Sequence, residues 1–191
     1  MIHHSRDYRH WADWCFIGWF FISTVSHECR ADPRIPNDLV YSGSKKLTDA
    51  VEGSLLDAGK LVLSPTRTYA PVMVEILKKF RNEIGGVIHC SGGAQTKILH
   101  FVDNLHIIKD NLFEIPPLFK LIQEESATGW KEMYKVFNMG HRMEIYADKS
   151  IADEIISISQ SFGIPAQIVG RVEKSDNKEL TIDTEWGNYQ Y

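Results

Sequence analysis

The spacing of apolar side chains divides the chain into a regular part and an irregular part. After residue 34, short apolar runs alternate with segments whose apolar residues recur every three or four positions, which predicts interleaved strands and helices. Residues 1–32 show neither the strand period nor the helix period. Because Pro33 and Pro36 break any element that precedes them, we expect a boundary there. The expected organisation is an atypical segment, disordered or mis-translated, at 1–33, one domain at 34–183 and a tail at 184–191.

Two segments in the first half of the regular part predict helices. In 68–81 the apolar residues share one face, and Lys78 and Lys79 come in the last turn, where the helix dipole favours cations. The segment 116–125 begins with prolines, which the first turn of a helix tolerates. The residues expected on the buried face of the first helix are Tyr69, Val72, Met73, Ile76 and Phe80.

The segment 150–162 has the clearest helical pattern. Ser150 stands where an N-cap is expected, and Asp153 occupies the capping-box position three residues later. Gly163 follows the last periodic residue and is expected to end the helix. The expected buried face consists of Ile151, Ile155, Ile158 and Phe162.

Short runs of apolar or alternating residues predict the strands. Strands and helices interleave along the chain, so the expected fold class is α/β (α+β), a mixed β-sheet with helices packed on it. The expected strands are 60–64, 86–90, 104–110, 142–148, 165–174 and 179–183.

Composition narrows the class of protein. Of 191 residues, 43% are hydrophobic and 24% charged, and the net charge is −4, which suits a globular protein without a nucleic-acid-binding stripe. The apolar run 15–25 has about half the ~20 residues that cross a bilayer, so we expect no membrane association. The three cysteines lack CxxC spacing, which favours a reducing, cytoplasmic location.

The stretch "GGVIHCSGGAQTKI", residues 85–98, is the first candidate site. A strand, a Gly92-Gly93 turn and a short helix from about Ala94 would present backbone N–H groups to an anion, although an ordinary turn has the same pattern. A Ser91–His89 hydrolytic pair is disfavoured because GxSxG is absent and no acid is identifiable. No metal site is expected there, since adjacent strand residues point to opposite faces.

Two further clusters carry candidate residues. In "LSPTRTY", residues 63–69, Thr66 is a candidate helix cap, and Arg67 either meets a phosphate or carboxylate or is a solvated arginine. In "VFNMGHRME", residues 136–144, Asn138 and Gly140 predict a turn between a helix and a strand.

These clusters occur in an order that resembles a known family. "LSPTRTY", "GGVIHCSGGAQTKI", "KEMYKVFNMGHRM" and "AQIVGRV" closely resemble the C-terminal half of aminoimidazole ribonucleotide synthetase, the phosphoribosylformylglycinamidine cyclo-ligase family, over residues 35–182. The chain departs from the family's usual pattern at Ala94, where glycine is common, and at His141 and Arg142. Residues 1–32 match nothing in the family.

The resemblance implies an enzyme of purine biosynthesis. Family enzymes use ATP and magnesium to close the imidazole ring of formylglycinamidine ribonucleotide, and they dimerise through an N-terminal ATP-binding domain that this chain does not show. The resemblance therefore implies a truncated, inactive chain that binds a small-molecule ribonucleotide but no cofactor by itself. It implies no catalytic role beyond a candidate one for His89. The implied substrate-binding residues are Thr66, Arg67, His89, Ser91, Gly92, Gly93 and Asn138.

Two alternatives remain open at this point. The first is the C-terminal domain of a related ATP-using enzyme: formylglycinamidine ribonucleotide synthetase, selenophosphate synthetase or a hydrogenase maturation protein. The second is a non-catalytic domain that binds a phosphorylated ligand or a partner. The "PTRTY" and "FNMG" stretches favour the cyclo-ligase over the first alternative.

Overall fold

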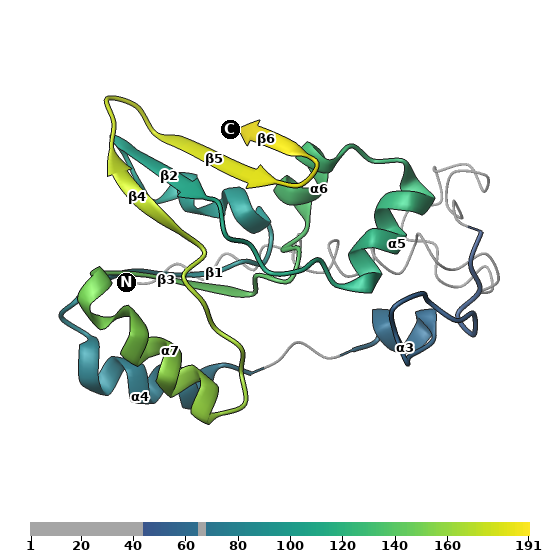
Figure 1. The fold of residues 1–191 in the computed structure, drawn as a ribbon, viewed down its shortest axis with the longest axis horizontal. Coiled ribbons are helices and arrows are strands. Elements are labelled where there is room, and N and C mark those ends of the chain that lie inside the picture. The colour runs from purple at the N-terminus through teal and green to yellow at the C-terminus, as the bar shows by residue number, and fades with distance from the viewer. Residues whose placement is uncertain (1–43, 65–67) are drawn as a thin grey trace, which may run out of the picture. The chain divides into compact units, whose positions relative to one another are not determined.

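The computed structural model describes residues 44–64 and 68–191, and the chain separates into two compact units (Figure 1). Of the described residues, 44–64 and 115–133 belong to the first unit, and 68–114 and 134–191 belong to the second. The expectations for residues 1–33, Thr66 and Arg67 therefore lie outside the described residues.

The first unit is helical. It contains α3 (Ala58–Val62) and α5 (Pro117–Ser126), and α6 (Trp130–Val136) begins in it. The side chain of Asp57 caps α3 by accepting a hydrogen bond from the backbone N–H of Lys60 at 2.8 Å. The buried apolar residues of this unit are Val51, Ala58, Ile115, Leu121, Ile122 and Met133.

In the second unit a pair of helices packs against a two-stranded antiparallel sheet. The helices are α4 (Ala70–Phe80) and α7 (Ala152–Ser161), and the strands are β1 (Ile84–His89) and β3 (Met143–Ala147). The helices lie side by side next to the two strands (Figure 1). The core between them consists of Val72, Ile76, Phe80 and Ile155, against which Ile84 and Ile145 of the strands pack. Each fully buried side chain of this size contributes about 1.5–3 kcal/mol.

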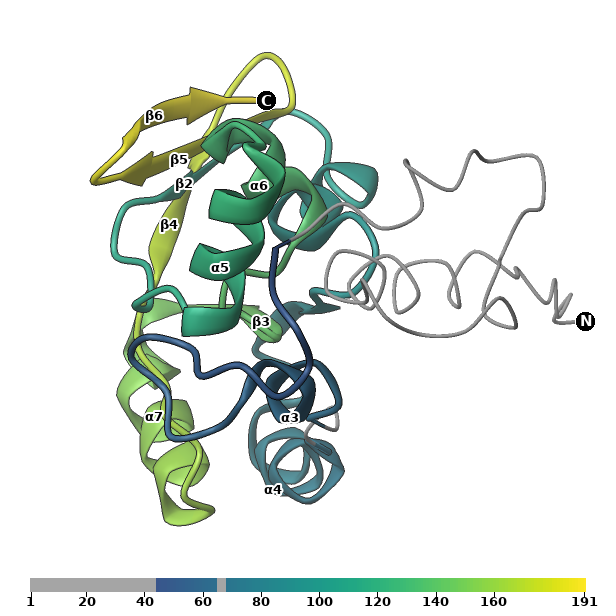
Figure 2. The ribbon, with the colours of Figure 1, turned by 90° about the vertical axis from the view of Figure 1, so that its right-hand side faces the viewer.

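The other four strands of the second unit form a mixed sheet in the order β4-β2-β5-β6. They are β2 (Leu105–Lys109), β4 (Gly170–Lys174), β5 (Glu179–Thr184) and β6 (Gly187–Gln190). The central pair β2–β5 is parallel, and the outer pairs are antiparallel. Figure 2 shows β5 and β6 as neighbours, with the C-terminus just beyond β6. The α+β class with a mixed sheet is confirmed, although the strands divide between two sheets.

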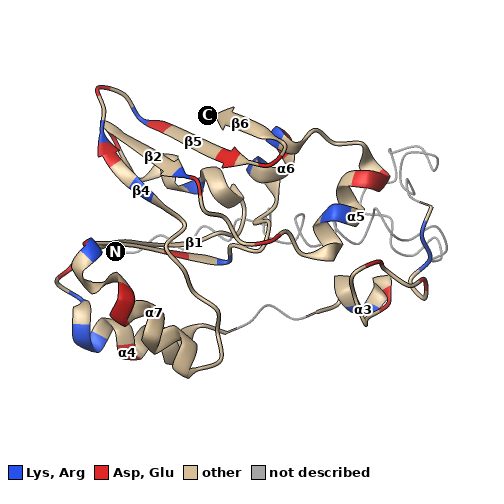
Figure 3. Cartoon of the chain, in the orientation of Figure 1, with Lys and Arg blue, Asp and Glu red and all other residues tan. Residues whose placement is uncertain are grey.

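Acidic and basic residues occur together on two of these elements. Figure 3 shows both charges on α4 and β4, whereas α7 and β5 carry acidic residues but no Lys or Arg. Lys79 of α4 pairs with Glu154 of α7, and Arg171 of β4 pairs with Asp110 and Glu173. Such exposed pairs contribute at most about 1 kcal/mol each.

Most of the expected elements are confirmed, with five corrections. Residues 60–64 are not a strand, because the Asp57 cap starts a helix whose last residues are the apolar run. Ser150 is not the N-cap of α7: Asp148 accepts from its N–H and hydroxyl, and a 3₁₀ turn, η3 (Lys149–Ile151), precedes the helix. Phe162 is 45% exposed rather than buried.

The other two corrections concern the last third of the chain. The expected strand 165–174 is paired only from Gly170, because residues 164–169 form a connection held by side chains and turns around Asn111. Residues 184–191 are not a loose tail, since β6 pairs with β5 and the backbones of Leu180 and Tyr191 exchange two hydrogen bonds. No helix of the described chain is long and apolar enough to cross a membrane.

A substitution at Gly170 tests whether the close approach of β4 to β2 requires a residue without a side chain. A Cβ built at Gly170 would lie 1.9 Å from the backbone oxygen of Ile108, so Gly170→Ala forces the strands apart. We expect the free energy of unfolding to fall by about 1–3 kcal/mol, measured by urea denaturation. Gly86→Ala in β1 is the matched control: its Cβ meets nothing within 4 Å, so its effect stays within about 0.5 kcal/mol. Equal effects of the two variants would contradict this packing argument.

Candidate functional site

The expected Gly-Gly loop is a tight turn between a strand and a short helix. β1 ends at His89, and a 3₁₀ helix, η2 (Ala94–His100), starts directly after Gly93. Gly93 has φ +84°, in the left-handed region that favours glycine, which gives this position of the motif a conformational reason. The strand, the turn and the short helix from Ala94 are thus confirmed.

The backbone N–H groups of the loop are only partly free for a ligand. Cys90 donates to Arg142, Ser91 to His89, and Ala94 to Ser91, at 2.8–2.9 Å. Within the described chain, no hydrogen-bond acceptor stands opposite the N–H groups of Gly92 and Gly93. The number of N–H groups available to an anion is therefore smaller than the sequence suggested.

Ser91 is not arranged as a nucleophile. Its hydroxyl lies 3.5 Å from the carbonyl oxygen of His89 and accepts a hydrogen bond from the ammonium of Lys97 at 3.0 Å. Its partners are thus a backbone carbonyl and a cation rather than an imidazole that could remove its proton. His89 is exposed, and Ser91 is half-buried.

The second expected segment, around Asn138, is a turn held by its own side chain. The Oδ1 atom of Asn138 accepts a hydrogen bond from the N–H of Gly140 at 3.0 Å, and Met139 and Gly140 have positive φ values of 51° and 97°. The expected turn is confirmed, and its left-handed positions follow Asn138 rather than include it. The side chain of Asn138 is therefore used within the turn.

The side chain of Gln95 connects the loop to this turn. Gln95 is fully buried in η2, and its Nε2 donates to the carbonyl oxygen of Asn138 at 2.8 Å. Its Oε1 accepts from the ammonium of Lys109 at 2.9 Å. Because an ammonium can only donate hydrogen bonds, the oxygen of the Gln95 amide, and not its nitrogen, must face Lys109. Two segments 43 residues apart in sequence are thereby joined by one side chain.

Lys109 and Glu144 form a buried ion pair beside Gln95. The Lys109 side chain points inward from β2 and is 2% exposed. Its three N–H groups are used by the backbone oxygen of Gln95 at 2.9 Å, Oε1 of Gln95 at 2.9 Å and Oε1 of Glu144 at 2.5 Å. The other oxygen of Glu144 accepts from the Tyr146 hydroxyl at 2.7 Å. Burial, followed by the charge of Glu144, raises the pKa of Tyr146, so Tyr146 stays protonated and donates.

Two other titratable groups around the pair are held neutral. Burial, and then the charge of Lys109, lowers the pKa of His141 to about 3. The neutral ring accepts the N–H of Phe113 on Nε2 at 3.0 Å. Burial, and then the charge of Glu144, raises the pKa of Cys90 to about 12, so its thiol is not a nucleophile at neutral pH.

Sequence reasoning missed Gln95, Lys97, Lys109 and Glu144. Lys109 and Glu144 stand in strands at inward positions, where an alternating pattern predicts apolar side chains. An inward-facing Lys in one strand and an inward-facing Glu in another would have been the signal of a buried pair.

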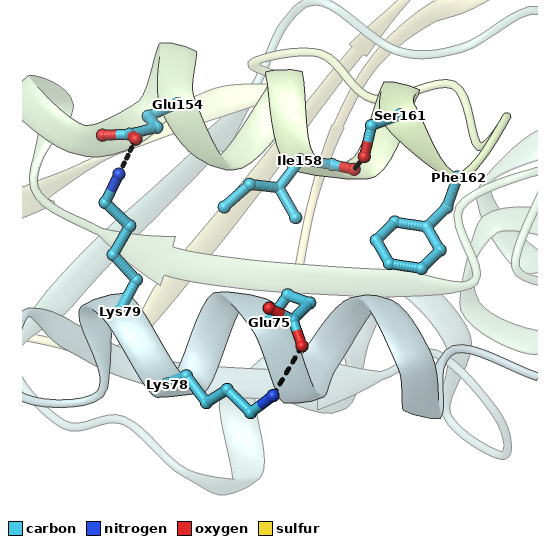
Figure 4. A pocket seen from close by; sticks show the side chains of 7 residues that line it. All are labelled: Glu75, Lys78, Lys79, Glu154, Ile158, Ser161 and Phe162. Carbon is cyan, nitrogen blue, oxygen red and sulfur yellow. Dashed lines mark hydrogen bonds and ion pairs between the residues drawn. The ribbon is translucent and has the colours of Figure 1, made fainter.

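The groove between α4 and α7 is a weaker candidate. Figure 4 shows Ile158 and Phe162 inside it and charged residues along its rim. The charged groups pair with one another, Glu75 with Lys78 and Lys79 with Glu154. The Ser161 hydroxyl donates to the carbonyl of Ile158 in the same helix. The polar groups that line this groove are therefore used internally.

The comparisons with known proteins agree with the sequence pattern. A family model described as "AIR synthase related protein, C-terminal domain" matches residues 45–183. The phosphoribosylformylglycinamidine cyclo-ligase of Syntrophus aciditrophicus is 32% identical over 143 residues, 70% of this chain and 39% of the relative. The enzyme of the same name from Methanococcus vannielii is 37% identical over 131 residues, which are 66% of this chain and 36% of the relative. The enzyme from Methanocaldococcus jannaschii is 36% identical over 124 residues, which are 63% of this chain and 35% of the relative. The chain thus spans less than two fifths of these relatives' length.

Removal of one partner of the buried pair tests its role in stability. Lys109→Met leaves Glu144 charged and buried beside Tyr146 alone, so we expect the free energy of unfolding to fall by about 3–5 kcal/mol. The matched control is Lys79→Met, which breaks an exposed pair and costs less than about 1 kcal/mol. Both values follow from urea denaturation. A Lys109→Met chain as stable as the control would refute the ion pair.

The lowered pKa of His141 predicts acid sensitivity. The unfolded ring has its ordinary pKa of 6.5, so between about pH 6.5 and pH 3 the unfolded chain binds more protons than the folded one. The contribution of His141 to the free energy of unfolding therefore falls as the pH decreases through this window, by up to ~1.4 kcal/mol per pH unit. Above pH 6.5 this contribution is constant. In His141→Gln, whose amide oxygen can accept from Phe113, this component disappears. The measurement is the stability difference between wild type and variant from pH 7 to pH 4, and a constant difference would disprove the assignment.

Proposed function

Because the chain belongs to the AIR synthase related protein family through its C-terminal domain, we propose that it is the C-terminal part of a phosphoribosylformylglycinamidine cyclo-ligase. The proposed reaction is the ATP-dependent closure of the imidazole ring of formylglycinamidine ribonucleotide, a step of purine biosynthesis. The three relatives described above carry this enzyme's name, which supports the cyclo-ligase over the other ATP-using enzymes.

The observation that carries the proposal is the junction made by Gln95. Gln95 belongs to the stretch of the Gly-Gly loop, and its buried amide donates to the backbone of a second stretch that resembles the family, the Asn138 turn. A loop fixed from beneath in this way is preorganised, and preorganised N–H groups bind a developing or permanent negative charge without a reorganisation cost. In the proposed site His89, Ser91, Gly92 and Gly93 bind the ribonucleotide, while Asn138 shapes the adjoining turn.

The proposal extends to Thr66 and Arg67, which we place near the phosphates by resemblance alone. An arginine suits this task because its planar fork binds phosphate oxygens in pairs. His89 is the candidate catalytic residue, since it is an exposed imidazole at the end of β1.

The described residues do not fit magnesium. Among residues 44–64 and 68–191, no three His, Cys, Asp or Glu side chains are grouped so that they could hold a metal ion. We propose that this chain by itself binds ribonucleotide without turning it over, because phosphoryl transfer requires groups that hold ATP and its metal.

Titration with formylglycinamidine ribonucleotide tests the proposed function. We expect saturable binding to the isolated chain by calorimetry, and no product when ATP and magnesium are added. His89→Ala is expected to weaken binding about two- to tenfold, the effect of losing one hydrogen bond. The control His100→Ala removes another exposed histidine, from η2, and should leave the affinity unchanged.

The outcomes separate the parts of this proposal. The substrate assignment fails if the ribonucleotide does not bind. Turnover by the isolated chain would instead refute its proposed dependence on further groups. Equal weakening by both histidine variants would remove His89 from the site.

A further inference from the structure

Lys97 lies across the Gly-Gly loop, and sequence reasoning gave it no role. It stands in η2, and its ammonium donates to the carbonyl oxygen of His89 at 3.1 Å and to the hydroxyl of Ser91 at 3.0 Å. Its stem passes close to Gly93, since a Cβ at that glycine would lie 3.6 Å from the Cα and Cβ of Lys97. The side chain is half-buried and bridges both ends of the loop.

The ammonium of Lys97 is held by neutral oxygens alone. Lys60, Lys78, Lys79 and Lys109 each pair with a carboxylate, whereas Lys97 forms no ion pair within the described part of the chain. The carboxylate of Glu144 is already engaged by Lys109 and Tyr146. A half-buried cation whose contacts are dipoles is stabilised further when an anion binds beside it.

The donors around Lys97 suit an anion with several oxygens. A lysine ammonium has three N–H groups, and two of those of Lys97 are directed to His89 and Ser91. The third belongs to an ammonium that is already bound to this loop, in which the N–H groups of Gly92 and Gly93 have no acceptor among the described residues. Successive backbone N–H groups with one lysine are a recurring way to bind phosphate.

We propose that Lys97 contacts the phosphate of a phosphorylated small molecule bound at the Gly-Gly loop. This inference rests on the proposed function, because it assigns the phosphate contact within the same site. Lys97 has a second effect in this site. Its hydrogen bond to Ser91 holds the hydroxyl beside the ammonium, so the two groups can contact the same ligand.

The experiment is an amide-resolved NMR titration of the full chain with inorganic phosphate and with ribose 5-phosphate, with ribose as the uncharged control. We expect both phosphates, and not ribose, to shift the amides of Gly92 and Gly93 saturably. Lys97→Met should weaken the binding of both at least about tenfold, and Lys97→Arg should retain most of it.

Lys178→Met is the matched control, since it removes the same charge from an exposed lysine in the connection between β4 and β5. It should leave both affinities unchanged. Lys97→Gln, a polar replacement, serves if Lys97→Met does not give a wild-type amide spectrum. If the wild-type chain binds neither phosphate, or if loss of the Lys97 charge weakens binding no more than Lys178→Met does, the proposal is overturned.

Failure of this proposal can be distinguished from failure of the proposed function. Phosphate binding that requires Lys97, without binding of formylglycinamidine ribonucleotide, would support the contact and reject the substrate. Ribonucleotide binding that is unaffected by Lys97→Met would support the substrate and reject the contact.

Discussion

A lysine ammonium cannot remain in the interior of a protein without partners, and Lys109 meets this requirement with all three of its N–H groups. Its partners come from η2 and from β3, so one charge determines how the loop helix and both sheets of the second unit fit together. Gln95 extends the constraint to the Asn138 turn. The rigidity of the candidate site therefore comes from the buried side chains of Gln95, Lys109 and Glu144.

The elements that could be predicted are those with a consistent local pattern. α4 has a clear helical period, and Val72, Ile76 and Phe80 on its expected apolar face are buried. α3 was missed because a short apolar run suits a strand or a helix equally, and the Asp57 cap decides between them. β6 was missed because its polar residues gain stability only from pairing with β5, which no local pattern records.

The candidate site divides in the same way. Gly93 and the Asn138 turn could be predicted because a special backbone conformation restricts the residue types that adopt it. The Lys109–Glu144 pair could not, since it joins residues 35 positions apart and contradicts the apolar pattern of both strands. Gly170 shows a further limit: its stretch resembles the family, yet its role here is close strand packing rather than chemistry. A stretch that resembles the family can therefore contain residues that maintain the fold as well as residues of the site.

The parallel pairing of β2 with β5 has a consequence for the order in which the chain folds. The side chains of His106 and Thr181, which hydrogen-bond across these strands, are 75 residues apart, so this contact closes one of the longer loops of the second unit. During synthesis β2 emerges well before either of its neighbouring strands. In that interval the charge of Lys109 keeps the strand solvated and discourages pairing with other chains, as edge lysines do in finished sheets. The residue that fixes the mature core would thus also protect the strand before the core exists.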